Sequence, residues 1–381
     1  MWIERVFGWL GSLRLTVLCL AGASLLVFAG TLAQVDAGIY VAQAKYFRSW
    51  FILWDLPGTS LRLPVFPGGY LLGAVILVNL LCAYARRAGF TRKNIGLWLV
   101  HLGLALMLLG QLASDILAVE SSMRLTEGEA RNYSEDPRRV ELAVIDTSAA
   151  QDDRVVAIPQ NVLARPGEIP HPDLPFTVRV ARYWPNSVHV PSVEATGPAL
   201  ATQGLGLQFR LRETPAETRQ DRRDMPTAYV ELLSPTGSLG TWAVSLWLDR
   251  SQTVTFQNRT YDLTLRLARY YKPFAIQLVK FTHEKYRGTD TPRNFASDIR
   301  LRNTQTGEDR ALRIYMNNPL RYGGETFYQS GFDERDPRVS ILQVVRNPGW
   351  VTPYLACALV GLGLTVQFLS HLFEFVREKR A

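Results

Sequence analysis

Residues 95–114 read IGLWLVHLGLALMLLGQLAS and contain no aspartate, glutamate, lysine or arginine. An α-helix needs about 20 predominantly apolar residues to cross the hydrocarbon core of a bilayer. Three further windows, 15–35, 67–85 and 350–370, are free of the same four residue types. The sequence therefore predicts four transmembrane helices, three near the N-terminus and one near the C-terminus.

A polar block of residues 120–346 separates the third window from the last. The 381-residue chain is 47% hydrophobic and 20% charged, and most of the charge lies outside the windows. This split excludes a fully soluble enzyme, a transporter with many spans and a disordered tail. We expect a membrane region over 1–119, a β-rich extracytoplasmic domain over 120–346, and a fourth helix with a cytoplasmic tail over 347–381.

The polar block shows the alternation of apolar and polar residues that is typical of strands with one buried face. The pattern recurs in four segments, 176–180, 207–212, 261–267 and 299–302. No long helical period separates these segments, which disfavours a parallel α/β sheet. We therefore expect a large antiparallel β domain with a sandwich-like architecture.

The chain offers no sign of soluble catalysis. All three cysteines lie in the apolar windows, so the polar block has neither a disulfide framework nor a Cys-x-x-Cys motif. Motifs for serine hydrolases, zinc proteases and phosphate-binding loops are absent. His171, His189 and His283 are isolated in sequence and are expected to be surface or strand-face residues. No catalytic residue is predicted.

Basic residues near the ends of the windows predict the orientation in the membrane. Segment 86–93 carries four of them, and the C-terminal tail carries Arg377, Lys379 and Arg380. Both termini are therefore expected in the cytoplasm, and the β domain outside the cytoplasmic membrane. The net charge of +8 follows from this bias, and no nucleic-acid partner is expected. The first window resembles a signal peptide but is longer, so we favour a retained span; cleavage would leave the remaining topology unchanged.

Segment 36–66 is rich in aromatic residues, which concentrate at the headgroup level of membranes. We expect it to lie along the outer membrane surface. Whether it is an interfacial belt or a binding platform stays open.

His101 is the one histidine in the four windows. It follows Asn94 by seven residues, or about 10 Å along a helix. Asn94, His101, Leu108 and Asp115 recur every seven residues and so share one helix face. A histidine at this depth usually faces a bundle interior or a site. Two interpretations remain: a hydrogen bond to a neighbouring helix, for instance to Asn79 or a backbone carbonyl, or ligation of a metal or haem.

Two segments resemble a known family. The first runs from Asn79-Leu80-Leu81-Cys82 through Arg86-Arg87 to His101-Leu102-Gly103, and the second is residues 317–329, NNPLRYGGETFYQ. Both are similar to the ResB (CcsB) family of System II cytochrome c biogenesis proteins. The order of three spans, a β-rich domain and one final span is also similar.

The resemblance implies a subunit of the System II cytochrome c synthase, which carries haem across the membrane and attaches it to apocytochrome c. It implies a multi-span partner of the CcsA (ResC) type and a transient haem b shared with that partner. His101 matches the family's axial haem ligand in this subunit. Such a subunit is non-catalytic or co-catalytic. The alternative is a membrane-anchored β-domain adaptor that binds an extracytoplasmic protein without haem.

Overall fold

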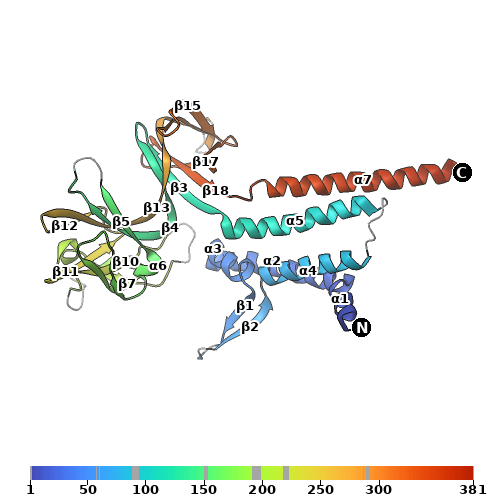
Figure 1. The fold of residues 1–381 in the computed structure, drawn as a ribbon, viewed down its shortest axis with the longest axis horizontal. Coiled ribbons are helices and arrows are strands. Elements are labelled where there is room, and N and C mark those ends of the chain that lie inside the picture. Colours follow the sequence, from blue (N-terminus) through green and yellow to red (C-terminus); the bar gives the residue numbers. More distant parts are fainter. Residues whose placement is uncertain are drawn as a thin grey trace. The chain divides into compact units, whose positions relative to one another are not determined.

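Figure 1 shows the fold of the chain in a computed structural model. The structure describes residues 2–56, 58–59, 61–87, 94–149, 153–190, 199–217, 223–285, 287–288 and 292–380. The chain divides into two compact units. One, the helical unit, contains residues 1–119 and 346–381; the other, the β unit, contains residues 120–217 and 221–345.

The described part of the helical unit contains four helices of 19 to 29 residues, two shorter α-helices and a short hairpin. Its elements are α1 (Trp2–Leu10), α2 (Leu13–Ala37), α3 (Ile39–Ala42), the π-turn η1 (Gln43–Phe47), β1 (Phe51–Asp55), β2 (Arg62–Pro67), α4 (Gly69–Arg87), α5 (Ile95–Leu117) and α7 (Thr352–Arg380). Ser12 caps α2, because its side chain accepts a hydrogen bond from the Leu15 backbone N–H at 3.2 Å.

Three described helices, α2, α5 and α7, are long and apolar enough to cross a membrane. The predicted count of four is not confirmed, because the window 67–85 forms the shorter apolar helix α4, which starts only at Gly69. Pro67 ends β2 and Gly68 makes a hairpin contact, since its N–H donates to the Trp50 carbonyl at 2.9 Å. The hairpin thus takes residues from the start of that window.

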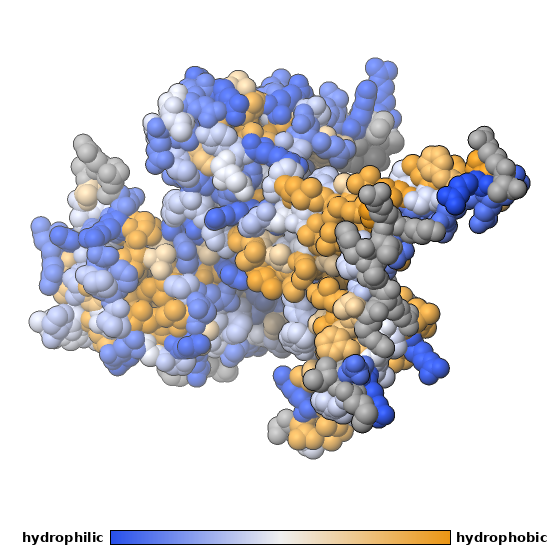
Figure 2. Space-filling view, turned by 45° about the vertical axis from the view of Figure 1, so that its right-hand side comes forward, coloured by the Kyte–Doolittle hydropathy of each residue, from blue (hydrophilic) through white to orange (hydrophobic). Residues whose placement is uncertain are grey.

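Large apolar side chains cover the outside of the helices (Figure 2). Leu18 on α2 is 69% exposed, and Phe368 on α7 is 67% exposed. An apolar exterior of this kind suits lipid and is unusual on a soluble protein. The helices therefore indicate association with a membrane, while the orientation in it stays a prediction. Residues 88–93 of the basic segment lie outside the described part of the chain.

Helices α5 and α7 pack closely because α5 presents glycines to α7. A Cβ at Gly96 would lie 2.7 Å from the Gln367 backbone nitrogen, and one at Gly103 would lie 2.8 Å from the Ala356 carbonyl oxygen. Small residues at helix contacts are the usual means of close packing in membranes. Gly110 continues the stripe against Thr352. This face of α5 therefore has no room for larger side chains at these positions.

The aromatic segment 36–66 forms α3, η1 and most of the β1–β2 hairpin. Trp50, Phe51 and Trp54 are each more than half exposed. A single hairpin is marginally stable in water, and this one presents apolar side chains to the outside. Its location at the membrane surface stays a prediction.

The β unit is antiparallel, as predicted. Its elements are β3 (Val119–Thr126), β4 (Ala130–Asp146), β5 (Arg154–Pro159), α6 (Gln160–Leu163), β6 (Gly167–Ile169), β7 (Thr177–Trp184), β8 (Ser187–Val190), η3 (Gly204–Leu207), β9 (Arg210–Glu213), β10 (Thr227–Ser234), β11 (Gly237–Ser245), β12 (Gln252–Phe256), β13 (Arg259–Lys285), β14 (Pro292–Asn303), β15 (Glu308–Tyr315), β16 (Leu320–Tyr322), β17 (Glu325–Phe332) and β18 (Val339–Arg346).

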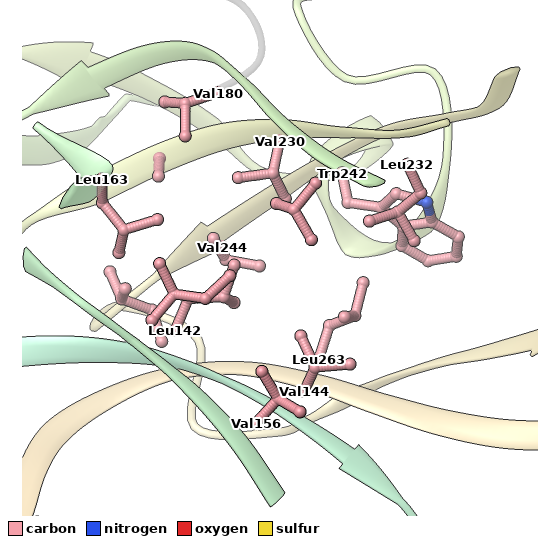
Figure 3. Packing of buried hydrophobic residues seen from close by; sticks show 14 of the residues in the cluster. Leu142, Val144, Val156, Leu163, Val180, Val230, Leu232, Trp242, Val244 and Leu263 are labelled. Atoms are coloured by element: carbon pink, nitrogen blue, oxygen red, sulfur yellow. The ribbon is translucent and has the colours of Figure 1, made fainter. Parts of the chain in front are cut away.

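Two sheets enclose the first hydrophobic core. The four-stranded sheet β11-β10-β7-β6 faces strands β4, β5, β12 and the first half of β13. Their apolar side chains point toward one another (Figure 3), as in Val230 against Leu142 and Leu263, which are all 0% or close to 0% exposed. This half of the unit is the sandwich that the alternation predicted.

The second core lies along the other half of β13. Met123, Ile276, Ile299, Phe327 and Leu342 are among its buried side chains. They come from strands β3, β13, β14, β17 and β18 of the ten-stranded sheet. The 27-residue strand β13 therefore contributes to both cores, which a sandwich of two separate sheets would not require.

The predicted strand at 207–212 is only partly correct. Residues 204–207 form the 3-10 turn η3, and the strand β9 covers Arg210–Glu213. Gly204 has a φ of 66°, and Gly206 approaches the Cβ of Ala243. The glycines thus bend the chain away from the extended form that alternation alone suggested.

Carboxylates on the surface of the β unit are held in their ionised form. Hydrogen bonds from Ser238 and Arg179 lower the pKa of Glu231, and a hydrogen bond from Arg124 lowers the pKa of Asp333. These pairs bridge neighbouring or distant strands. They make folding of this unit sensitive to acid.

Candidate functional site

His101 lies in the second turn of α5 and is partly buried. Its Nδ1 is 2.8 Å from the backbone carbonyl oxygen of Leu97. A carbonyl oxygen can only accept, so Nδ1 carries the proton and donates. The neutral ring then has its lone pair on Nε2, which is the form of imidazole that binds a metal.

Tyr84 of α4 packs against the histidine. The ring centroids of Tyr84 and His101 are 4.7 Å apart, and Trp98 lies edge-on to Tyr84 at 4.2 Å. The Tyr84 hydroxyl is buried and has no hydrogen-bond partner among the described residues. A polar group of a bound molecule would satisfy that hydroxyl.

The glycine stripe determines which way His101 faces. Gly103 is directed at α7, and His101 precedes it by two residues, which is about 200° around a helix. The histidine therefore lies on the side of α5 that is turned away from α7 and toward α4.

The donor set fits one half of a haem site. A single imidazole with a free Nε2 can serve as one axial ligand, and low-spin haem takes two. The described residues contain no group of three or more His, Cys, Asp or Glu side chains that could hold a metal ion.

The predicted partner Asn79 does not contact His101. Its amide nitrogen bonds to the carbonyl oxygens of Leu10 and Ser12, and its oxygen accepts from Thr16 at 2.7 Å. These bonds tie α4 to the α1–α2 turn. The sequence suggested two hydrogen-bond partners for His101 on a neighbouring helix, Asn79 or a backbone carbonyl. The structure shows a backbone carbonyl, but it belongs to Leu97 of the same helix as His101.

The polar stripe of α5 ends in a set of non-local bonds. Asp115 forms an ion pair with Arg48, Nε to Oδ1 at 2.7 Å, and accepts a hydrogen bond from the Tyr70 hydroxyl. Its side chain is only 11% exposed. The positive charge of Arg48 thus compensates the negative charge of Asp115, at the end of α5 far from His101.

Sequence reasoning missed a second histidine in a membrane helix. His371 lies one residue beyond the window 350–370, but α7 continues to Arg380. Its Nε2 is 2.8 Å from Nε2 of Gln367, and the residue is exposed. The spacing of seven between Gly96, Gly103 and Gly110 was also a readable signal for the packed face of α5.

The three histidines of the β unit are separate from one another. His171 is close to Asp173, and His189 packs edge-on against Phe209. The ring of His283 stacks on that of Phe295, with centroids 4.7 Å apart, and is tilted against that of Phe332 at 4.4 Å.

The segment 317–329 forms a tight hairpin of the second core. β16 and β17 are joined by Gly323 and Gly324, both with positive φ, as a two-residue hairpin turn requires. A side chain at Gly323 would clash with the Phe274 ring, since its Cβ would lie 2.8 Å from Cε1. The side chain of Phe327 is fully buried.

Polar contacts fasten this hairpin to long strands. Lys272 of β13 forms an ion pair with Glu325, Nζ to Oε2 at 2.7 Å, and its side chain is only 3% exposed. The Tyr322 hydroxyl donates to Glu308 at 2.6 Å and accepts from Asn303 at 2.9 Å. The segment therefore has a structural role, because it covers part of the second core.

These features define a membrane-associated protein with a large antiparallel β unit. Residues 234–341 match the model of the ResB-like family. This range runs from the end of β10 into β18 and includes the hairpin at 317–329.

A relative of known sequence adds to this match. The chain is 31% identical over 131 residues to Protein NrfI of Wolinella succinogenes. The alignment covers 34% of the chain and 14% of that much longer protein. The two findings confirm the resemblance to the ResB family.

Proposed function

We propose that this protein is a subunit of a System II cytochrome c synthase. In this role it helps to carry haem, as cargo, across the cytoplasmic membrane and to present it for covalent attachment to apocytochrome c. The match to the ResB-like family over 234–341 supports a role in cytochrome c biogenesis. The chain acts as a non-catalytic or co-catalytic subunit, with both termini in the cytoplasm and α4 as a fourth span.

His101 carries the proposal. It is an imidazole in an apolar helix, with Nδ1 bonded to Leu97 and no described residue bonded to Nε2. A polar group at this depth in a membrane helix is costly unless it serves a site. The bound Nδ1 fixes the ring, as an outer hydrogen bond commonly does for a metal-ligating histidine. His101 then holds haem iron on one side.

The opposite axial ligand comes from a multi-span partner of the CcsA type. The helical unit offers no second histidine beside His101: His371 is 11 residues beyond Val360 along α7, and Val360 packs at the level of Gly103. That separation is about 16 Å along the helix. The haem b is therefore shared between two proteins and released when the complex hands it on.

The test compares His101→Gly with His371→Ala in the complex purified with its partner in mild detergent. We expect His101→Gly to lose most of its haem by absorption spectroscopy, and added imidazole to restore part of it by supplying the same nitrogen. His371→Ala should keep its haem. Unchanged haem content and unchanged cytochrome c maturation in His101→Gly would overturn the proposal.

The β1–β2 hairpin supports a second candidate function, a β-domain adaptor without haem. Its exposed aromatic side chains, Trp50, Phe51 and Trp54, suit a protein or membrane contact. Under this alternative the complex would contain no haem, and His101→Gly would mature cytochrome c normally.

A further inference from the structure

The helical unit contains a cavity of about 770 Å³ at the end of α5 remote from His101. Helices α4 and α5 line it, together with Gln34 of α2, α3, η1 and residues that follow η1. This volume lies within the range of small-molecule sites in proteins, roughly 300–1,000 Å³.

One end of the cavity is polar. Arg48, Asp115 and Tyr70 lie here, joined by the ion pair and the hydrogen bond described above. Both bonds go to Asp115, and the ion pair with Arg48 compensates its charge. Arg48 uses Nε for this pair, its side chain is 54% exposed, and a guanidinium has four further N–H groups on its terminal nitrogens. Those groups can bind a carboxylate or phosphate oxygen.

The other end is apolar. Leu77 of α4 and Leu108 of α5 line it, two helical turns from Tyr70 and Asp115 respectively. Seven residues correspond to about 10 Å along a helix, so the cavity is about 10 Å deep. A volume of 770 Å³ over this depth gives a mean cross-section of about 75 Å², close to that of an α-helix about 10 Å across. The cavity is consequently broad and short.

Gly73 of α4 keeps the cavity open. It lines the cavity, and a Cβ built on it meets nothing within 4 Å. The glycines of α5 differ, because each is in close contact with α7. A larger side chain at Gly73 would therefore enter the empty space without disturbing a packed neighbour.

We propose that this cavity is a binding site for a compact amphiphile with an acidic head group. The acid pairs with Arg48 at the polar end, and the apolar body lies against Leu77 and Leu108. The breadth of the cavity favours a ring system or a folded chain over one extended chain. A porphyrin with carboxylate side chains and an acidic lipid share this chemistry.

Recognition by Arg48 and the apolar wall requires no iron coordination. The lining residues include no histidine, cysteine or methionine. The site is therefore distinct from His101, and it does not depend on the proposed haem ligation.

The experiment uses the full-length chain in nanodiscs of uncharged lipid. The variants are Gly73→Leu, Arg48→Gln and, as a matched control, Gly361→Leu, because Gly361 of α7 also faces open space but does not line the cavity. The probes are metal-free protoporphyrin IX, which cannot bind His101 through iron, and a brominated palmitate. Porphyrin fluorescence reports the first probe, and bromine quenching of Trp50, which lines the cavity, reports the second, with Trp50→Phe as its reference.

We expect at least one probe to bind saturably to the wild type and to Gly361→Leu. Gly73→Leu should abolish this binding, and Arg48→Gln should weaken it about tenfold or more, as loss of a charged hydrogen bond does. The probe that binds identifies the porphyrin or the lipid as the source. Circular dichroism establishes that each variant is folded. Saturable binding of neither probe, or equal binding to Gly73→Leu and wild type, would overturn the proposal.

Discussion

Glu325→Gln should strongly destabilise the β unit, because it leaves the Lys272 ammonium buried without its partner. The Lys272 side chain is 3% exposed, whereas that of Glu325 is 15% exposed. Removing one partner of a buried ion pair costs about 3–5 kcal/mol. For a unit of this size, about 1 kcal/mol lowers the melting temperature by roughly 2–4 °C, so we expect a decrease of about 6–20 °C.

The opposite change should cost less. Lys272→Met keeps an unbranched apolar side chain near the Phe327 ring, whose centroid is 5.8 Å from Nζ. It leaves a carboxylate that partly reaches water, for a loss of about 1–3 kcal/mol. The double variant Lys272→Met/Glu325→Leu replaces the pair by apolar groups and should be close to neutral or more stable.

The assay is urea unfolding of residues 120–345, followed by circular dichroism and tryptophan fluorescence. Wild type, Lys272→Met, Glu325→Leu and the double variant form a double-mutant cycle, which isolates the interaction between the two side chains, and Glu325→Gln is measured beside them. The reasoning is refuted if Glu325→Gln costs less than about 1 kcal/mol, or if the double variant loses the sum of the two single losses.

Three further predictions concern packing, acid and topology. Gly103→Leu should separate α5 from α7 and lower the thermal stability of the full-length protein in detergent, while Gly361→Leu should leave it unchanged; equal melting temperatures would contradict the packing described here. The unfolding free energy of the isolated β unit should fall as the pH drops below 4.5 and 3.8, the ordinary pKa values of Glu231 and Asp333, because both pKa values are lowered in the folded state; a pH-independent urea midpoint between pH 6 and 3 would disprove this. A cysteine at the exposed position Thr236 should react with an impermeant thiol reagent from outside intact cells, and labelling that requires lysis would reverse the proposed topology.

Local patterns predicted most of the fold. The alternation at 261–267 found part of β13, and the apolar windows found α2, α5 and α7. The same patterns failed at two places. The hairpin β1–β2 took residues from the start of the second window, and glycines at 204 and 206 replaced the start of a strand by a turn.

The candidate site was predictable only in part. Position and period identified His101 and the polar face of α5. Its neighbour Tyr84 and the Arg48–Asp115 pair depend on how α4 and η1 pack on α5, which no local pattern encodes. His371 was missed because the uncharged window ends at residue 370, whereas helix α7 continues beyond His371.

The order of strands has a consequence for how the protein is made. The first strand of the β unit, β3, has the last strand, β18, as its neighbour in the sheet. β3 follows α5 directly, and β18 is followed by α7 after five residues. If the β unit is exported as we propose, its sheet cannot be completed until nearly all of its chain has crossed the membrane. During that interval β3 has a partner, β4, on one side only, so the nascent chain would need protection from aggregation until synthesis reaches its final helix.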